Sequence, residues 1–301
     1  MSSKKPSCFV ATIDLSLAEK LRGDLLEKGF ELTQPAHTIF SAQKKGVSCT
    51  LYTSGKLTVQ GKEMEEFITF YLEPEILKSV TFSYPEAEVN FTARIGIDEA
   101  GKGDFFGPLC VAGVQADENK IKELLSFGVR DSKRLSDDTV LKMSKKIRAS
   151  CPHSIIKISP IKYNELYEKF KNLNHLLAWG HATAIGELVE KTKCTEVIID
   201  QFASEHVVES ALRRKALEVN LTQRHGGESD PVVAAASILA RAAFLEGLDD
   251  LSRTVGMTLP KGASQIVVEA ARKLVRQQGE EILKTVAKLH FKTRNEVLNS
   301  L

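Results

Sequence analysis

The sequence predicts an α/β protein of two domains, and three observations lead to this prediction. Short β-type runs separated by Gly-containing turns fill much of residues 8–60. From residue 93 onward, apolar strand-like runs alternate with amphipathic helical segments, as in an α/β domain. A length of 301 residues suits one large domain or two ordinary ones. Because residues 73–92 contain two prolines and no convincing long element, the expected division is a first domain over 1–80, a linker over 81–92 and a second domain over 93–301.

The first domain is expected to be a small α+β unit with a multi-stranded antiparallel sheet. A strand over 8–15 precedes a helix over 17–28, for which Ser16 is a plausible N-cap and Gly29 the residue after the end. Further strands, joined by turns at 45–46 and 54–55, are expected over 30–32, 38–43, 47–52 and 57–60, and a helix over 63–72.

Lysines outnumber acids in the sheet region of this first domain. The lysines are Lys44, Lys45, Lys56 and Lys62, and Phe40 and Tyr52 lie near them in the sequence. A basic sheet face with aromatic residues is what a nucleic-acid platform would look like. An ordinary solvated sheet surface explains the same residues, and the sequence leaves both interpretations open.

The second domain begins with the most informative stretch of the chain, residues 95–104 (Ile-Gly-Ile-Asp-Glu-Ala-Gly-Lys-Gly-Asp). An apolar run that ends at Ile97 is followed by Asp98 and Glu99, a Gly-rich turn and a second apolar run, which predicts a hairpin with an acidic tip. Two carboxylates about 4 Å apart repel by roughly 4 kcal/mol at an effective dielectric near 20. Water, a proton or a cation must offset this repulsion, and a solvated acidic turn is the alternative to a cation site.

Glycines favour the cation site over the solvated turn. Gly101 and Gly103 let the backbone approach a ligand closely, and successive N–H groups in such turns bind anions. Lys102 adds a mobile positive charge between them. A Mg²⁺ ion is typically held by one or two carboxylates together with substrate phosphates. The turn therefore indicates metal-assisted phosphodiester chemistry.

Two more acids occupy positions where α/β sheets place their chemistry. Asp200 ends an apolar strand predicted over 195–200. Asp230 precedes Pro231 and a helix predicted over 232–248, whose small residues 234–237 allow close packing. Each acid also has a purely structural interpretation, since Asp200 can be a turn residue and Asp230 a helix N-cap.

The remaining elements complete the α/β pattern. Helices are expected over 118–127, 137–149, 174–191, 266–277 and 280–287, and strands over 154–159 and 216–222. In the loop over 130–136, Lys133 can contact a phosphate, or the loop can simply cap the next helix through Ser136. His175, Trp179 and His181 are expected to be packing or surface residues rather than ligands. From Arg253 onward, nine Lys and Arg face four acids, so the tail is either a backbone-binding patch or an ordinary solvated surface.

Bulk composition limits the classes of protein that are possible. The formal net charge is only +2, so any affinity for nucleic acid must come from local patches. The five cysteines are isolated and lack Cys-x-x-Cys spacing, which disfavours a disulfide framework or structural zinc. No signal-type apolar segment follows the N-terminus, and no run looks long enough to span a bilayer. We expect a cytoplasmic protein that acts as a monomer and has no membrane partner.

In their order along the chain, these residues resemble the signature of the type 2 ribonucleases H, most closely the ribonuclease HIII branch. The signature consists of Asp98-Glu99-Ala100-Gly101-Lys102-Gly103, then Asp131-Ser132-Lys133, then Asp200, then Asp230 ahead of Ala234-Ala235-Ala236-Ser237. Lys102 in place of the Arg usual in ribonuclease HII points to the HIII branch. The extra N-terminal domain, which in that branch has a TATA-binding-protein-like fold, points the same way.

The resemblance implies a ribonuclease H-like mixed sheet flanked by helices and hydrolysis of the RNA strand of RNA/DNA hybrids, leaving 5′-phosphate and 3′-hydroxyl ends. It implies that Asp98, Glu99, Asp200 and Asp230 hold two Mg²⁺ or Mn²⁺ ions. Substrate contacts would come from Gly101, Lys102, Gly103 and Lys133, and from Lys44, Lys45 and Lys56 of the first domain. One departure matters: ribonuclease HII carries a Tyr after its Lys-Gly, whereas this chain has Lys261-Gly262-Ala263. Cleavage at single embedded ribonucleotides is therefore in doubt.

Overall fold

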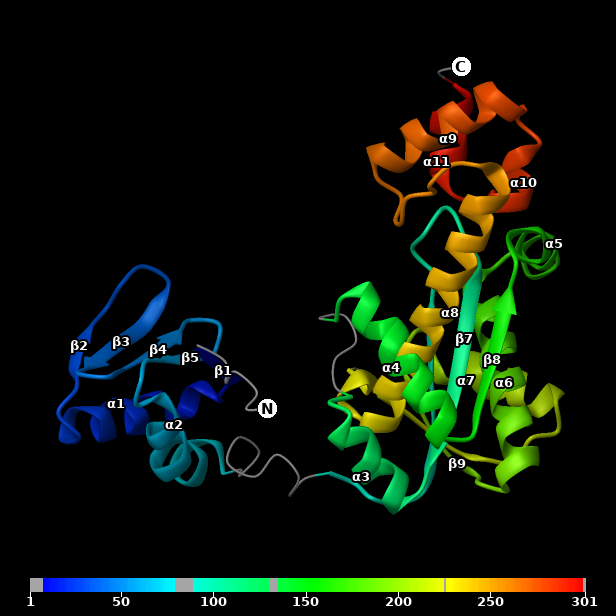
Figure 1. Ribbon diagram of the computed structural model, residues 1–301. Coiled ribbons are helices and arrows are strands. Elements are labelled where there is room, and N and C mark those ends of the chain that lie inside the picture. The colour runs from blue at the N-terminus through cyan, green and yellow to red at the C-terminus, as the bar shows by residue number, and fades with distance from the viewer. Residues whose placement is uncertain (1–7, 79–88, 130–134, 225, 300–301) are drawn as a thin grey trace. The chain divides into compact units, whose positions relative to one another are not determined.

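The computed structural model describes residues 8–78, 89–129, 135–224 and 226–299, without the side chains of Glu205 and Glu228. Lys133 and the Asp131-Ser132-Lys133 motif lie outside these residues. The chain divides into two compact units, residues 1–90 and 91–301 (Figure 1).

The first unit is an α+β structure with one five-stranded antiparallel sheet, as predicted. Its strands are β1 (Cys8–Thr12), β2 (Glu31–Thr33), β3 (Thr38–Lys44), β4 (Val47–Tyr52) and β5 (Lys56–Gln60), arranged in the order β1-β5-β4-β3-β2. Its helices are the 3-10 helix η1 (Leu15–Leu17), α1 (Ala18–Glu27), α2 (Met64–Phe67) and the π-helix η2 (Ile68–Leu77).

Helices cover one face of this sheet and leave the other open. Leu21 and Leu25 of α1 pack with Leu51 and Val59 of the sheet in one buried cluster. Because side chains alternate along a strand, the residues between the buried ones face the opposite side. Phe40 belongs to the buried cluster and is 2% exposed, so the prediction of Phe40 beside an exposed basic face is wrong.

Two helical segments of the first unit differ from prediction, one in its N-terminal cap and the other in its type and length. Asp14, not Ser16, caps the first helical turn, since its carboxylate accepts from the backbone N–H of Ser16 at 2.8 Å. The helix predicted over 63–72 is one α-helical turn that continues as a π-helix to Leu77 and contains Pro74. Proline removes a donor from an α-helix and clashes with the preceding turn, and the wider π-helical turn accommodates it.

The second unit is built on a five-stranded mixed sheet, which confirms the predicted fold class. Its strands are β6 (Arg94–Ala100), β7 (Leu109–Ala116), β8 (His153–Ile158), β9 (Glu196–Asp200) and β10 (Asn220–Arg224). They lie in the order β10-β9-β6-β7-β8. β10, β9 and β6 run parallel to one another, and β6, β7 and β8 form an antiparallel meander.

Helices cover both faces of the mixed sheet (Figure 1). The helices of this unit are α3 (Glu118–Ser126), α4 (Asp137–Ser150), α5 (Pro160–Phe170), α6 (Leu173–Thr192), α7 (Glu205–Arg214), the 3-10 helix η4 (Gly227–Ser229), α8 (Pro231–Val255), α9 (Gln265–Gln278), α10 (Ile282–Val286) and α11 (Lys292–Leu298). α6 and α8 contact the sheet, whereas α9, α10 and α11 lie together at one end of the unit. Ser136 caps α4, as predicted. The sequence prediction omitted α5, although Ser159 and Pro160 are good N-cap and N1 residues. Asn172, not Asn174, caps α6.

Alternation along β6 fixes which residues meet which helix layer. Ile97 packs with Ile185 and Leu188 of α6 in one buried cluster. Gly96 faces the other side, where a Cβ would lie 2.5 Å from the backbone of Val232 in α8. The glycine therefore lets α8 lie directly on the sheet, and Asp98, two residues further on, faces the same helix.

α8 is longer than the helix predicted over 232–248, and most of it is buried. It spans 25 residues, with a mean hydropathy of 1.5 over its most apolar window and 83% of that window buried. By length and composition it is the single candidate membrane span in the described part of the chain, so the expectation that no run is long enough is wrong. A helix that is apolar on all sides is also what a position between a sheet and other helices requires, and α8 packs against β6, β7 and α4.

Candidate active site

Two carboxylates occupy adjacent parallel strands, one residue beyond the last pair in register. Ile97 of β6 is in register with Ile199 of β9, so Asp98 and Asp200 occupy the next positions on neighbouring strands. Both isoleucines belong to the cluster under α6, and alternation therefore places both aspartates on the α8 face. The Asp200 Oδ1 atom accepts from the backbone N–H of Gly227 at 3.0 Å, which ties η4 to this strand end.

Glu99 faces the opposite side of the same strand. The sequence analysis ended this strand at Ile97, but β6 continues to Ala100, and Asp98 and Glu99 pair with Ala112 and Val111 of β7. The Glu99 Oε2 atom accepts from Nε2 of His181 on α6 at 3.0 Å, and its Oε1 atom lies 3.7 Å from Nζ of Lys102. The two adjacent acids thus approach the strand end from different faces.

The environments of these two acids move their pKa values in opposite directions. Burial, reinforced by the negative charge of Glu99, raises the pKa of Asp98 to about 7, although hydrogen bonds from Ser237 and the Glu99 N–H oppose the rise. Burial also acts to raise the pKa of Glu99, but the hydrogen bond from His181 and the charge of Lys102 outweigh it, and the net pKa is lowered. The carboxyl of Asp98 therefore lacks a counter-charge that Glu99 has.

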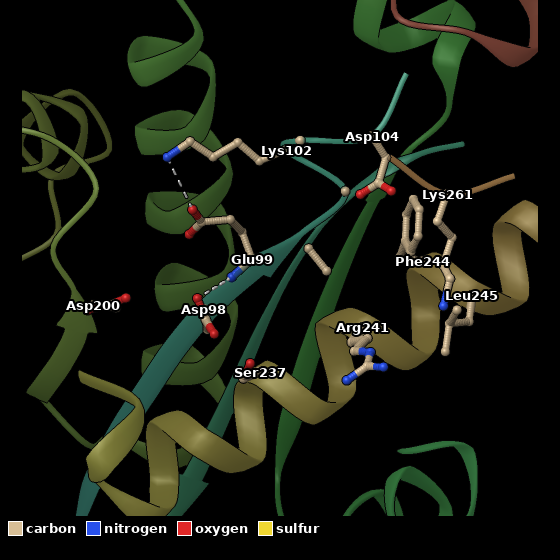
Figure 2. Close-up of a pocket in the computed structure, with 13 residues that line it drawn as sticks. Asp98, Glu99, Lys102, Asp104, Asp200, Ser237, Arg241, Phe244, Leu245 and Lys261 are labelled. Atoms are coloured by element: carbon tan, nitrogen blue, oxygen red, sulfur yellow. Dashed lines mark hydrogen bonds and ion pairs between the residues drawn. The ribbon is translucent and has the colours of Figure 1, made fainter. Parts of the chain in front are cut away.

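These groups line one cavity of about 490 Å³. Figure 2 shows Asp98, Glu99 and Asp200 on one side and Arg241 and Lys261 on another. Asp137, the first residue of α4, holds both cations, because its carboxylate accepts from Arg241 at 2.8 Å and from Lys261. We call this space the acidic cavity.

Gly101 and Gly103 have different roles in the turn that borders the cavity. Gly101 has φ +87°, and a Cβ there would lie 2.3 Å from the carbonyl oxygen of Pro108, so the fold itself requires glycine. Gly103 has no atom within 4 Å of the position that its Cβ would take. An approaching ligand can therefore reach the backbone at Gly103, and Lys102 between them is 40% exposed.

A buried lysine supports this turn from behind. Lys288 is fully buried, and its Nζ donates to the carbonyl oxygens of Asp104 and Gly107, each at 2.8 Å. Burial lowers the pKa of Lys288 to about 8, and the charge of Asp104 opposes the fall. The Asp104 carboxylate in turn accepts from the backbone N–H of Gly262 at 2.6 Å. The turn is thus fixed by contacts from the segments that connect the C-terminal helices.

Asp230 is not brought to the acidic cavity. Its Oδ2 accepts from Nε of Arg94 at 2.9 Å and pairs with a second Arg94 nitrogen at 2.8 Å, and its Oδ1 accepts from the N–H of Val232 at 2.8 Å. Asp230 is 5% exposed and does not line the cavity. The structure shows this carboxylate as a helix cap and the counter-ion of a buried arginine, and it does not bring Asp230 together with the three acids of the cavity.

A different acid lies in the segment next to Asp200. Glu228 follows Gly227 in η4, and a Cβ on Gly227 would lie 2.8 Å from the backbone of Asp200. Glu228 therefore follows a residue that lies directly against the backbone of Asp200.

The predicted basic platform of the first unit is divided between two sides. Lys44 lies on the helix-covered side, where its Nζ donates to the Lys28 carbonyl at 2.8 Å and lies 5.8 Å from the Phe30 ring centroid. Lys44 thus lies on the other side of the sheet from Lys56, and its contact with substrate stays a prediction. Lys56 alternates with buried Leu57 and lies on the open face, and Lys45 is exposed in the turn between β3 and β4.

The open face of the first unit is polar. Around Lys56 it presents Ser48, Thr50, Tyr52, Thr58 and Gln60, which alternate with core residues along β4 and β5. The hydroxyls of Ser41 and Thr50 lie 2.9 Å apart across two strands.

Sequence reasoning missed several residues at the acidic cavity. His181 was assigned to packing, and no sequence signal connects it with Glu99, which lies 82 positions earlier. Arg241 had a usable signal, because it follows Ser237 by four residues and so lies on the same helix face. Phe202 follows Asp200 by two residues and was also missed.

The cavity has the chemistry of a divalent-cation site. Hard divalent cations prefer carboxylate oxygens, which Asp98, Glu99 and Asp200 present to one space. In the described part of the chain, no three acidic, His or Cys side chains are close enough to form a finished ligand cluster. Burial and the charge of Glu99 raise the pKa of Asp98, and a bound cation would lower it by stabilising the carboxylate.

Comparisons with known proteins agree with this geometry. The family described as Ribonuclease HII matches residues 95–294, and a domain family of unknown function, DUF3378, matches residues 8–81. A ribonuclease HIII of Protochlamydia amoebophila (strain UWE25) is 56% identical over 301 residues, 100% of this chain and 99% of the relative. A ribonuclease HIII of Chlamydia felis (strain Fe/C-56) is 49% identical, over 97% of this chain and 98% of the relative.

Solved structures give the same result. Bst-RNase HIII in complex with Mn²⁺ matches with a TM-score of 0.69 and 31% identity, over 97% of this chain and 98% of that chain. Aquifex aeolicus RNase H3 matches with a TM-score of 0.56 and 27% identity, over 94% of this chain and 99% of that chain. The chain belongs to the ribonuclease HIII branch of the type 2 ribonuclease H family and is a ribonuclease H.

Proposed function

We propose that the chain hydrolyses the RNA strand of RNA/DNA hybrids at the acidic cavity, leaving 5′-phosphate and 3′-hydroxyl ends. The observation that carries this proposal is the register that places Asp98 and Asp200 side by side, with Glu99 lining the same cavity. Asp98, Glu99 and Asp200 would hold two Mg²⁺ or Mn²⁺ ions. Bound there, divalent ions supply charge that activates water and stabilises the leaving oxygen of a phosphodiester. The Mn²⁺ in the related Bst-RNase HIII structure supports this choice of ion.

The chain's own groups position the substrate and the acids. Hydrogen bonds from Ser237 and the Glu99 N–H orient Asp98, and His181 orients Glu99. The turn at Gly101, Lys102 and Gly103 would bind the nucleic-acid backbone beside a ribose, where the 2′-hydroxyl distinguishes RNA from DNA. The openness at Gly103 supports this role.

The first unit would hold the hybrid through its open sheet face. Ser, Thr and Gln side chains with Lys56 and Tyr52 present donors and acceptors suited to sugars and phosphates. Lys45 would add a phosphate contact, as would Lys133, which lies outside the described residues. The small net charge supports local rather than global attraction.

We also propose that the protein acts as a cytoplasmic monomer without a membrane partner. The five free cysteines support a reducing compartment. The burial of α8 supports a role as a core helix rather than a membrane span.

The test is a cleavage assay on an end-labelled RNA/DNA hybrid, a DNA duplex with one ribonucleotide, and double-stranded RNA, each with Mg²⁺, Mn²⁺ or EDTA. We expect metal-dependent cleavage of the hybrid. The products should be substrates for a ligase that requires a 5′-phosphate and a 3′-hydroxyl. Preferential cleavage of the single-ribonucleotide duplex would show junction cleavage of the ribonuclease HII type instead. Cleavage of the hybrid in EDTA would contradict the metal-dependent mechanism.

A further inference from the structure

Four side chains form a closed ring of contacts at one edge of the acidic cavity. His181 donates to Glu99 at 3.0 Å, and Glu99 lies 3.7 Å from the Lys102 ammonium. The Lys102 ammonium lies 5.8 Å from the ring centroid of Phe202, and Phe202 packs on His181 with ring centroids 4.6 Å apart. The ring joins β6, its Gly-rich turn, α6 and the segment after Asp200.

The two oxygens of Glu99 differ in how firmly they are occupied. Oε2 is held by a fully buried histidine at hydrogen-bond distance. Oε1 has the ammonium of Lys102 at 3.7 Å, beyond a good hydrogen bond, and Lys102 is 40% exposed. Because this contact is long and its cation is partly exposed to water, Oε1 is the oxygen that a stronger cation can take.

Phe202 provides the Lys102 ammonium with a second favourable position. A cation within about 6 Å of an aromatic centroid is attracted to the ring face. Lys102 therefore keeps one partner when it loses Glu99, and it stays at the cavity edge.

We propose that Lys102 is an exchangeable internal counter-ion of Glu99. A divalent cation displaces it from Oε1, and Phe202 then holds the freed ammonium where it binds a phosphate of the substrate. Metal binding and substrate binding are thereby coupled through Lys102, with Phe202 as its positioning residue. This inference rests on the proposed function for the identity of the substrate, but its first half concerns the free protein and a metal ion only.

The first test measures Mn²⁺ binding to the full chain without substrate, by electron paramagnetic resonance of free Mn²⁺. Lys102→Met removes the competing cation and is expected to tighten Mn²⁺ binding roughly two- to five-fold, the range of an exposed ion pair. Lys157→Met is the matched control, since Lys157 is 43% exposed, pairs with Asp250 at 3.5 Å and does not line the cavity. The control should leave Mn²⁺ binding unchanged. Unchanged or weaker binding by Lys102→Met would overturn the counter-ion role.

The second test is a double-mutant cycle on hybrid cleavage. Phe202→Leu should raise KM about two- to five-fold and leave kcat near the parent value, because a cation–π contact at an exposed site is lost. The same change in the Lys102→Met background should leave KM unaltered. An equal rise of KM in both backgrounds would show that Phe202 acts through general packing and not through Lys102.

The two tests separate this inference from the proposed function. If the parent protein cleaves hybrid but Lys102→Met fails to tighten Mn²⁺ binding, the counter-ion role is wrong and the proposed function stands. If Lys102→Met tightens Mn²⁺ binding but the parent protein cleaves no hybrid, the counter-ion role stands and the proposed function is wrong.

Discussion

The protein contains two five-stranded sheets that differ in what covers them. The antiparallel sheet of the first unit has helices on one face only, and its other face is lined by Ser, Thr, Gln and Lys. The mixed sheet of the second unit is covered on both faces, and its acids lie where parallel strands end.

Coverage determines what polar groups can do on each sheet. Groups on an open face keep their water, which suits broad recognition of a sugar-phosphate backbone. Carboxylates at the end of a covered sheet lose part of their hydration, and the pKa of Asp98 rises to about 7. Because these carboxylates are partly desolvated, a cation that binds them is stabilising. Substitutions in the second sheet should therefore change catalysis and stability, whereas substitutions on the open face of the first sheet should change substrate affinity.

The largest expected effect is on catalysis at the covered sheet. Asp98→Asn should reduce hybrid cleavage on the order of a thousand-fold, because one of the charged oxygens that would hold the ions is lost. Binding of hybrid, measured by fluorescence anisotropy, should persist. Glu31→Gln, which removes an exposed acid from the open sheet, is the control and should alter the rate less than about two-fold. Near-normal cleavage by Asp98→Asn would remove Asp98 from the mechanism.

The next effect distinguishes a catalytic acid from a structural one. Asp230→Asn should lower the free energy of unfolding by about 3 kcal/mol, because buried Arg94 loses its counter-ion. Cleavage per folded molecule should fall far less than in Asp98→Asn. Glu228→Gln tests whether the acid that follows Gly227 takes part in catalysis. If it does, cleavage is lost while the denaturant midpoint changes little. A stable but inactive Asp230→Asn protein would restore Asp230 as a metal ligand.

These residues also show how far sequence reasoning reaches. Apolar runs followed by Asp98 and Asp200 identified two strands that carry acids near their carboxyl ends, because burial and strand periodicity are local properties. The same reasoning could not place Asp98 and Glu99 on opposite faces, since that depends on how far β6 pairs with β7. It also could not find the contact of His181 with Glu99 or choose between cap and ligand for Asp230. Those outcomes depend on helix packing between segments far apart in the chain.

A smaller effect is expected for the pH dependence of the stability of the metal-free protein, measured in EDTA. The pKa of Asp98 is raised in the folded state to about 7, so the folded protein binds more protons than the unfolded chain between about pH 4 and 7, and stability falls as pH rises through that window. Asp98→Asn should therefore stabilise the metal-free protein by about 2 kcal/mol at pH 8 and by little at pH 4. Thermal unfolding at both pH values measures this. An equal gain at pH 4 and pH 8 would show that the carboxylate charge is not its cause.

The two glycines of the turn should separate folding from binding. Gly101→Ala should lower the free energy of unfolding by about 2 kcal/mol, because its φ is +87° and its Cβ would meet the Pro108 carbonyl. Gly103→Ala should change the free energy of unfolding by less than about 0.5 kcal/mol, since the added methyl group meets no atom of the protein. It should raise KM for hybrid, because the methyl group occupies the space through which the substrate reaches the backbone. Denaturant unfolding and steady-state kinetics on both variants measure the two effects. An unchanged KM in Gly103→Ala would place the substrate elsewhere.

The smallest effect is expected on the open sheet. Replacing Lys45 and Lys56 together by Ala should raise KM by only a few-fold at physiological salt, since each exposed lysine contributes one phosphate contact. The slope of log affinity against log salt should become shallower by about 2, because two fewer counterions are released, while kcat at saturation stays near the parent value. Lys44→Ala is the matched control, because Lys44 lies on the covered side and already binds the Lys28 carbonyl. If Lys44→Ala changes the salt slope by half as much as the double replacement or more, the open face is not the binding face, and the contrast between the two sheets loses its functional meaning.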